Sequence, residues 1–173
     1  MRSSVLSIAV LTGLALGGTL SARPPQALQA PPSIKAEHHE IHEALVALTK
    51  ATGPVGAAAK ELAATLHPHF VREEEIALPP LGLLAALAAG KSPDGMREAL
   101  VMSDTLKGEM PRMLEEHKAI RAATDKLARA AKADGHAAGQ AFAATLAMHA
   151  RTEEEVLYPA AILVADVIRA RNR

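Results

Sequence analysis

Apolar residues recur at every third or fourth position along most of the chain, which is the spacing of one face of an α-helix. In the first such stretch Ile41 and Leu48 fall on one side. Ser33 is a hydroxyl residue that favours a helix start, and Gly53-Pro54 favours a helix end. The pattern therefore predicts a first helix from Ser33 to about Thr52.

Three more stretches have the same helical period and similar boundaries. They run over about 55–78, which Pro79-Pro80 ends, over 112–132, which Asp134-Gly135 ends, and over about 136–157. Pro159 is expected to kink the last helix rather than end it, because the apolar pattern continues to the C-terminal basic residues.

Residues 81–110 are predicted to form a helical connector between the second and third long helices. Their pattern indicates a short apolar helix, a glycine-bounded turn and an amphipathic segment. Ser92 is expected to cap that segment, with Pro93 at its first helical position. Pro111 is expected to mark a kink or a restart before the third long helix.

The composition supports an all-α fold. Hydrophobic residues make up 49 % of the 173 residues and are mostly Ala and Leu, whereas aromatic residues make up only 2 %. Ala and Leu favour helices, while β-branched and aromatic residues favour strands. We expect an up-and-down four-helix bundle over residues 34–171, with an internal two-helix repeat and a helical connector.

The N-terminal residues have a different pattern. Arg2 precedes an almost unbroken apolar run from Val5 to Leu16, followed by small residues up to Ala22. This pattern predicts a signal peptide over residues 1–22, hence export to the periplasm or the cell exterior. The alternative is an uncleaved membrane anchor, because the run is only slightly shorter than the ~20 residues of a membrane span. Residues 23–33 are rich in proline and are expected to form an extended linker.

Charge and cysteine content exclude several classes of partner and site. Nineteen basic residues balance nineteen acidic ones, so the protein has no net electrostatic field that would attract nucleic acid. No stable membrane span is expected in the mature form. Cysteine is absent, which excludes disulfides and thiolate ligands. A metal site in this chain must therefore use His, Asp and Glu.

One short motif occurs twice, eighty positions apart. The first copy contains His69, Glu73, Glu74, Glu75 and Pro79, and the second contains His149, Glu153, Glu154, Glu155 and Pro159. An upstream Glu-His pair precedes each copy at nearly the same offset, Glu37-His38 in the first half and Glu116-His117 in the second. The repeat indicates two helix pairs that deliver imidazoles and carboxylates to one shared place.

Helical geometry selects the candidate ligands. Residues four apart differ by only about 40° around a helix, so both members of each His-x-x-x-Glu pair lie on one face. The pair His38 and His42 has the same spacing, whereas the partner position of His117 is Arg121. The predicted metal ligands are His38, His42, His69, Glu73, His117, His149 and Glu153.

This ligand set suits iron, manganese or zinc better than calcium or magnesium. Five imidazoles, two bridging carboxylates and one oxo or hydroxo bridge fill about eleven of the roughly twelve positions around two octahedral ions. One position stays open, where dioxygen, peroxide or nitric oxide could bind.

The doubled motif His-x-x-x-Glu-Glu, with proline five residues after the second Glu, resembles the hemerythrin family, also called the HHE cation-binding domains. The resemblance covers about residues 34–160. It implies an up-and-down four-helix bundle around a non-haem di-iron centre that binds, transports or senses oxygen. Carried over to this chain, it implies His69 and His149 as motif ligands, Glu73 and Glu153 as bridges, and His38 and His117 as single histidines.

This chain departs from the family pattern at one place. Oxygen-carrying members have their His-x-x-x-His pair on the third helix, whereas here the pair His38 and His42 lies on the first and Arg121 stands at the matching position. Some members use a carboxylate one residue later, which keeps Glu154 as an alternative to Glu153. Glu74 is a weaker candidate ligand.

Three classes of function remain open at this point. The first is a protein that stores, transports or senses dioxygen or a related small ligand, and the second is a di-iron peroxidase or oxidase. The excess of imidazole over carboxylate favours the first over the second, because oxygen-activating bundles use more glutamates. The third is a metal-free structural bundle, which would have to bury many polar groups without a partner ion. The oligomeric state is not predicted.

The sequence also suggests a pH dependence. Without metal, histidines gathered at one place are expected to repel one another once protonated. Metal-free protein should then melt below metal-loaded protein, by a gap that widens as the pH falls.

Overall fold

The computed structural model describes residues 27–172 of the chain. The predicted signal peptide and the first residues of the linker lie outside the described residues. Every regular element within 27–172 is helical and none is a strand, so the predicted all-α class is confirmed. No helix in this part of the chain is both long and apolar enough to cross a bilayer.

The first two helices are α1 (Pro32–Thr49) and α2 (Gly53–Arg72). The expected cap at Ser33 is wrong, because α1 begins one residue earlier and no side chain caps it. Gly53 and Pro54 open α2 rather than end α1. Proline fits the first turn of a helix because the N–H groups there have no partner within the helix.

The helical path widens after α2. Glu73–Ala77 is a π-helical turn in which the N–H of Leu78 donates to the carbonyl of Glu73 at 2.9 Å. Pro79 follows directly, and the wider turn makes room for its ring, which would clash with a carbonyl of a regular α-helix. The second helix was predicted as one helix to residue 78, but its last residues form this turn. A 3-10 helix (Pro79–Leu83) and α3 (Leu84–Ala88) come next.

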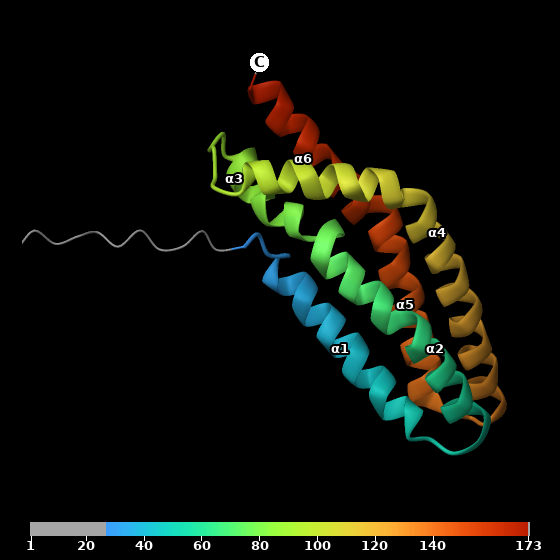
Figure 1. Cartoon of the computed structure of the whole chain (residues 1–173). Coiled ribbons are helices and arrows are strands. Elements are labelled where there is room, and N and C mark those ends of the chain that lie inside the picture. The colour runs from blue at the N-terminus through green and yellow to red at the C-terminus, as the bar shows by residue number, and fades with distance from the viewer. Residues whose placement is uncertain (1–26, 173) are drawn as a thin grey trace, which may run out of the picture.

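The helix α4 (Met96–Ala133) joins two segments that were predicted separately. It starts after Gly95, whose φ of 86° favours glycine, so the expected start with Ser92 and Pro93 is wrong. Pro111 lies inside α4, and Figure 1 shows the helix bend about midway along its length. A proline kink explains this bend, because the ring removes a hydrogen bond without ending the helix.

The last helical stretch repeats the design of the second. It consists of α5 (Ala137–Thr152), a π-helical turn (Glu153–Leu157) and α6 (Tyr158–Arg171). The Nδ1 of His136 accepts the N–H of Gly139 at 3.1 Å and caps α5. Helical structure continues past Pro159, as predicted, but the irregularity is the π turn that precedes the proline.

The helices α1, α2 and α5 and the C-terminal part of α4 lie side by side (Figure 1). Three apolar clusters fill the space between the described helices, and one of them lies at the end of the bundle around Leu83 and Ile168. Of the other two, one contains Leu62, Ile120 and Leu146 and the other Met113 and Tyr158. A polar layer separates them on each helix. On α4, for example, His117 lies between Met113 of one cluster and Ile120 of the other. Burial of each large apolar side chain stabilises the folded state by about 1.5–3 kcal/mol. The two clusters on either side of the polar layer therefore fix the helices that carry it.

Candidate metal centre

Six of the seven predicted ligands meet in this polar layer. They come from α1, α2, α4 and α5 and from the two π turns, and each is at most 3 % exposed. The six are His38, His69, Glu73, His117, His149 and Glu153.

The six side chains form two overlapping groups that could each hold a metal ion. One group contains His69, Glu73, His117 and Glu153, and the other contains His38, His149 and Glu153. Within each group, one ligand atom from every member lies within 4.8 Å of the others. Glu153 therefore belongs to both groups.

The two carboxylates reach towards both groups with different oxygens. Oε2 of Glu153 lies 3.5 Å from Nε2 of His117, while its Oε1 lies 2.9 Å from Nε2 of His149. Oε1 of Glu73 lies 3.5 Å from Nε2 of His69, while its Oε2 lies 3.8 Å from Nε2 of His38. This is the placement that a carboxylate needs to bridge two ions.

A second set of carboxylates orients the four imidazoles. In each ring Nδ1 meets a glutamate on another helix or turn, and Nε2 points inward. The pairs are His38 with Glu74 at 3.2 Å, His69 with Glu116 at 2.9 Å, His117 with Glu154 at 2.7 Å and His149 with Glu37 at 3.1 Å. A carboxylate at Nδ1 accepts the ring proton there, which leaves the Nε2 lone pair free for a metal.

Two of the inward Nε2 atoms lie close enough to repel one another unless a proton or a cation lies between them. Nε2 of His69 lies 2.8 Å from Nε2 of His117, although both rings have their Nδ1 on a carboxylate. Two lone pairs at this distance repel, so either a proton on one ring or a cation close to both must relieve the contact. Oε2 of Glu73 is buried without a hydrogen bond to any described residue, and so is Nε2 of His149, whose 2.9 Å contact with Oε1 of Glu153 lacks the angles of a hydrogen bond. The donor set therefore fits a bound metal cation.

The neighbouring charges move the histidine pKa values in both directions. Burial by itself lowers the pKa of His149, but the carboxylates of Glu153 and Glu37 outweigh it and raise the pKa to about 9. The pKa of His69 is also raised, because Glu73 and Glu116 outweigh burial. Burial and the nearby charge of His69 lower the pKa of His117.

The pKa values of the two candidate bridging carboxylates, Glu73 and Glu153, also move in opposite directions. Burial and the charge of Glu153 raise the pKa of Glu73. Burial opposes ionisation of Glu153 too, but His149 and His38 outweigh it and hold its pKa well below the ordinary value. One carboxylate is thus strongly ionised while the other is easily protonated when no metal is bound.

Tyr158 breaks the symmetry between the two halves. Its hydroxyl donates to Oε1 of Glu73 and lies 3.1 Å from Nε2 of His117. Burial and the Glu73 carboxylate raise the pKa of Tyr158 far above 10, so the phenol stays protonated. Leu78 stands at the equivalent position of the first half and is also fully buried. Tyr158 therefore touches two of the clustered side chains directly.

His42 is the predicted ligand that the structure does not bring to the centre. Its side chain is 45 % exposed, and its Nδ1 lies 3.8 Å from Glu43. The His-x-x-x-His spacing puts both residues on one side of α1, but only His38 faces inward. The alternative ligands Glu74 and Glu154 instead hold the outer nitrogens of His38 and His117.

Sequence reasoning missed the role of Glu37 and Glu116. Each directly precedes a single histidine, His38 or His117, but it contacts the imidazole of another helix. The signal was present in the repeated Glu-His dipeptide. Which imidazole each glutamate contacts depends on how the helices pack, and a local sequence pattern does not show this.

Comparison with known proteins agrees with this geometry. The family model described as "Hemerythrin HHE cation binding domain" matches residues 32–161. No curated protein and no solved structure matches the chain. The matched range contains all six clustered side chains and all four outer glutamates.

Proposed function

Since this chain belongs to the hemerythrin HHE cation-binding domain family, we propose that its buried cluster holds two iron ions, joined by an oxo or hydroxo bridge, in an up-and-down four-helix bundle. The centre binds dioxygen or a related small ligand for storage, transport or sensing. Nucleic acid is not a partner in this proposal.

The observation that carries the proposal is the inward convergence of four Nε2 atoms and two carboxylates that each face both groups. Imidazole and carboxylate together suit iron, manganese and zinc. Two ions, rather than one, agree with the two oxygens of Glu153 pointing to different groups of histidines. A metal-free bundle would have to bury Nε2 of His149 and Oε2 of Glu73 without a hydrogen bond, at a cost of about 1–3 kcal/mol for each unpaired group.

The ligands would divide between two ions. His69 and His117 would hold one ion, His38 and His149 the other, and Glu73 and Glu153 would bridge them. Four imidazoles, two bridging carboxylates and the oxo or hydroxo bridge fill about ten of the roughly twelve positions of two octahedral ions. When bound, iron would supply the redox-active place at which a small ligand attaches. The absence of His42 from the cluster leaves more open positions than the sequence predicted.

The protein surroundings have three tasks in this proposal. The outer glutamates hold each imidazole in the tautomer that presents Nε2 to the metal. The two apolar clusters on either side of the centre keep bulk water away from it. Tyr158 places a protonated hydroxyl beside Glu73 and His117, where it can donate a hydrogen bond to the bridging carboxylate.

Tyr158 also favours a second candidate, an enzyme of the peroxidase or oxidase type. A buried phenol next to the metal ligands can donate a hydrogen bond to a reacting oxygen ligand. The count of four imidazoles, rather than five, weakens the sequence argument against such an enzyme. Multiple turnovers of hydrogen peroxide would favour this candidate, and reversible binding without turnover would favour the first.

Metal analysis and absorption spectroscopy of the purified protein test the proposal. The expected result is about two irons per chain and a charge-transfer band that appears when the reduced protein meets air. One zinc per chain, or no metal after growth in iron-rich medium, would reject a di-iron centre. The same samples with hydrogen peroxide separate ligand binding from catalysis.

A further inference from the structure

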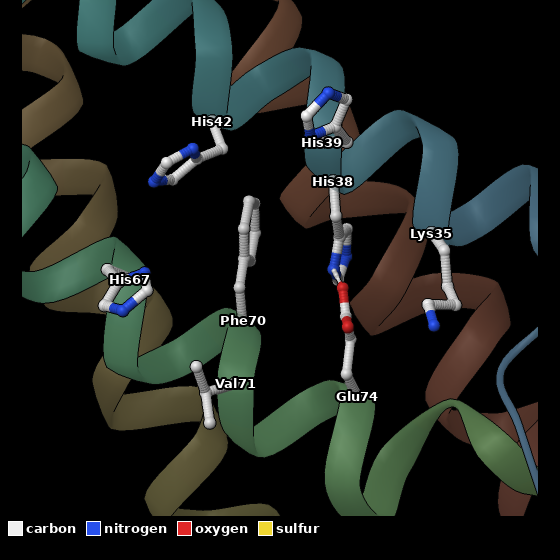
Figure 2. Close-up of a pocket in the computed structure, with 8 residues that line it drawn as sticks. All are labelled: Lys35, His38, His39, His42, His67, Phe70, Val71 and Glu74. Atoms are coloured by element: carbon white, nitrogen blue, oxygen red, sulfur yellow. Dashed lines mark hydrogen bonds and ion pairs between the residues drawn. The ribbon is translucent and has the colours of Figure 1, made fainter.

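A pocket opens between α1 and α2 just outside the buried centre. Its volume is about 360 Å³, and His38 and Glu74 form part of its wall. Three more histidines line the same pocket, of which His39 and His67 are exposed and His42 is half-buried. Figure 2 shows His42 on α1 and His67 on α2 on one side of the pocket, with Phe70 between them and His38. None of these three histidines belongs to the buried cluster.

The other half of the repeat explains why the pocket is open here. Arg121 stands at the position equivalent to His42, and its guanidinium donates to Glu154, the outer partner of His117. His42 makes no such contact with Glu74, the outer partner of His38. The side chain of Glu74 is accordingly 37 % exposed, whereas that of Glu154 is 25 % exposed. Because the first half has His42 where the second half has Arg121, no described side chain covers Glu74 in the way that Arg121 covers Glu154.

His42 instead faces another imidazole. The ring centroids of His42 and His67 lie 5.8 Å apart, with an angle of 49° between the ring planes. Two imidazoles that bind one ion through nitrogens at about 2 Å have centroids roughly 5–6 Å apart. We propose that His42 and His67 form a second, solvent-facing site for a divalent first-row transition-metal ion, distinct from the buried centre.

The chemistry of the surroundings agrees with a cation at this place. Neutral imidazole is a good ligand for zinc, copper, nickel and iron. Among the described residues, the imidazole of His67 makes no hydrogen bond, and the only ionic partner of His42 is Glu43, 3.8 Å from Nδ1. Glu43 adds a negative charge beside the site. Lys35 also lines the pocket, but Figure 2 places it on the far side of His38 from His42 and His67.

Zinc binding to the full chain tests this site, with the protein first saturated with iron and kept at a pH above the ordinary imidazole pKa of about 6.5. Equilibrium dialysis counts the zinc bound per chain. Wild type is expected to bind one zinc, and His42→Ala or His67→Ala should weaken it about 100-fold, because each removes one of two ligands that act together. His39→Ala, which changes another histidine of the same pocket, should keep the affinity of the wild type.

The variants also separate this proposal from the di-iron proposal. His42→Ala should retain the iron of the buried centre, while Glu153→Ala should lose it and still bind zinc at the outer site. Equal zinc affinity in wild type, His42→Ala and His67→Ala would overturn the outer site. An equal loss in His39→Ala would also overturn it, because zinc would then bind diffusely to surface histidines.

Discussion

The hydroxyl of Tyr158, in the first turn of α6, donates a hydrogen bond to Oε1 of Glu73 in the π turn that follows α2. The contact joins the two repeats directly, since the residues lie 85 positions apart. It gives a fully buried carboxylate a donor that does not depend on metal. The equivalent residue of the first repeat, Leu78, can make no such bond.

Tyr158→Phe is expected to destabilise the metal-free protein. It keeps the ring but leaves a buried oxygen of Glu73 without its donor, which costs about 1–3 kcal/mol. For a chain of this size each kcal/mol shifts the melting temperature by about 2–4 °C. Thermal melts of the metal-free proteins measure the difference. An unchanged melting temperature would show that the hydroxyl is dispensable to Glu73.

Glu153→Ala is expected to remove most of the bound metal. Glu153 belongs to both groups of ligands, so its loss leaves both ions short of a ligand. Iron per chain should fall from about two to below one. Glu155→Ala is the matched control, because Glu155 is 59 % exposed and pairs with Arg151. Full iron in Glu153→Ala, with helical content preserved, would show that Glu153 does not bridge.

Glu116→Ala is expected to weaken metal binding without removing a ligand. Glu116 accepts the Nδ1 proton of His69 at 2.9 Å, and loss of such an orienting carboxylate lowers metal affinity about 10–100-fold. Competition with a chelator measures the change. Glu115→Ala changes the neighbouring glutamate, which is 69 % exposed and contacts Lys118, and it should leave the affinity unchanged.

Metal-free protein is expected to gain stability as the pH falls. The folded pKa of His149 is about 9, above the unfolded value of about 6.5. Its contribution is therefore complete below about pH 6.5 and lost as the pH rises through about 9. His69 acts in the same direction, because its pKa is also raised. His117 opposes them, because its pKa is lowered.

The metal-loaded protein should respond in the opposite direction. Protons compete with metal for the imidazoles, so metal is lost as the pH falls. At alkaline pH the loaded form should melt roughly 10 °C higher, since ligand at about 1,000 times its Kd adds about 4 kcal/mol. Melting curves of both forms from about pH 5 to about pH 9 test this. The gap should shrink towards acid, and a gap that widens would contradict the carboxylate contacts described here.

This expectation reverses the one drawn from the sequence. Repulsion between protonated histidines was expected to dominate in the metal-free protein. In the structure, each imidazole has a glutamate at its outer nitrogen, and Glu153 lies among the inner ones. Their negative charges favour protonation of His69 and His149, so the sign changes.

Local sequence patterns were enough to predict the helical class, the repeat and six of the clustered side chains. Helical periodicity is a local property, so the face shared by His69 and Glu73 follows from their spacing alone. The same holds for His149 and Glu153. The family assignment followed from these motifs and is confirmed. Export through a signal peptide stays a prediction.

The position of His42 depends on how the helices pack. Spacing confines His38 and His42 to neighbouring directions about 40° apart, but the rotation of α1 against its neighbours decides which of them is buried. Local pattern likewise could not tell that α4 continues through Pro111, because packing against other helices compensates the hydrogen bond that proline removes. The partners of the outer nitrogens were undetermined for the same reason. Glu37 and His149 are 112 positions apart, and only the packing of α1 against α5 brings them into contact.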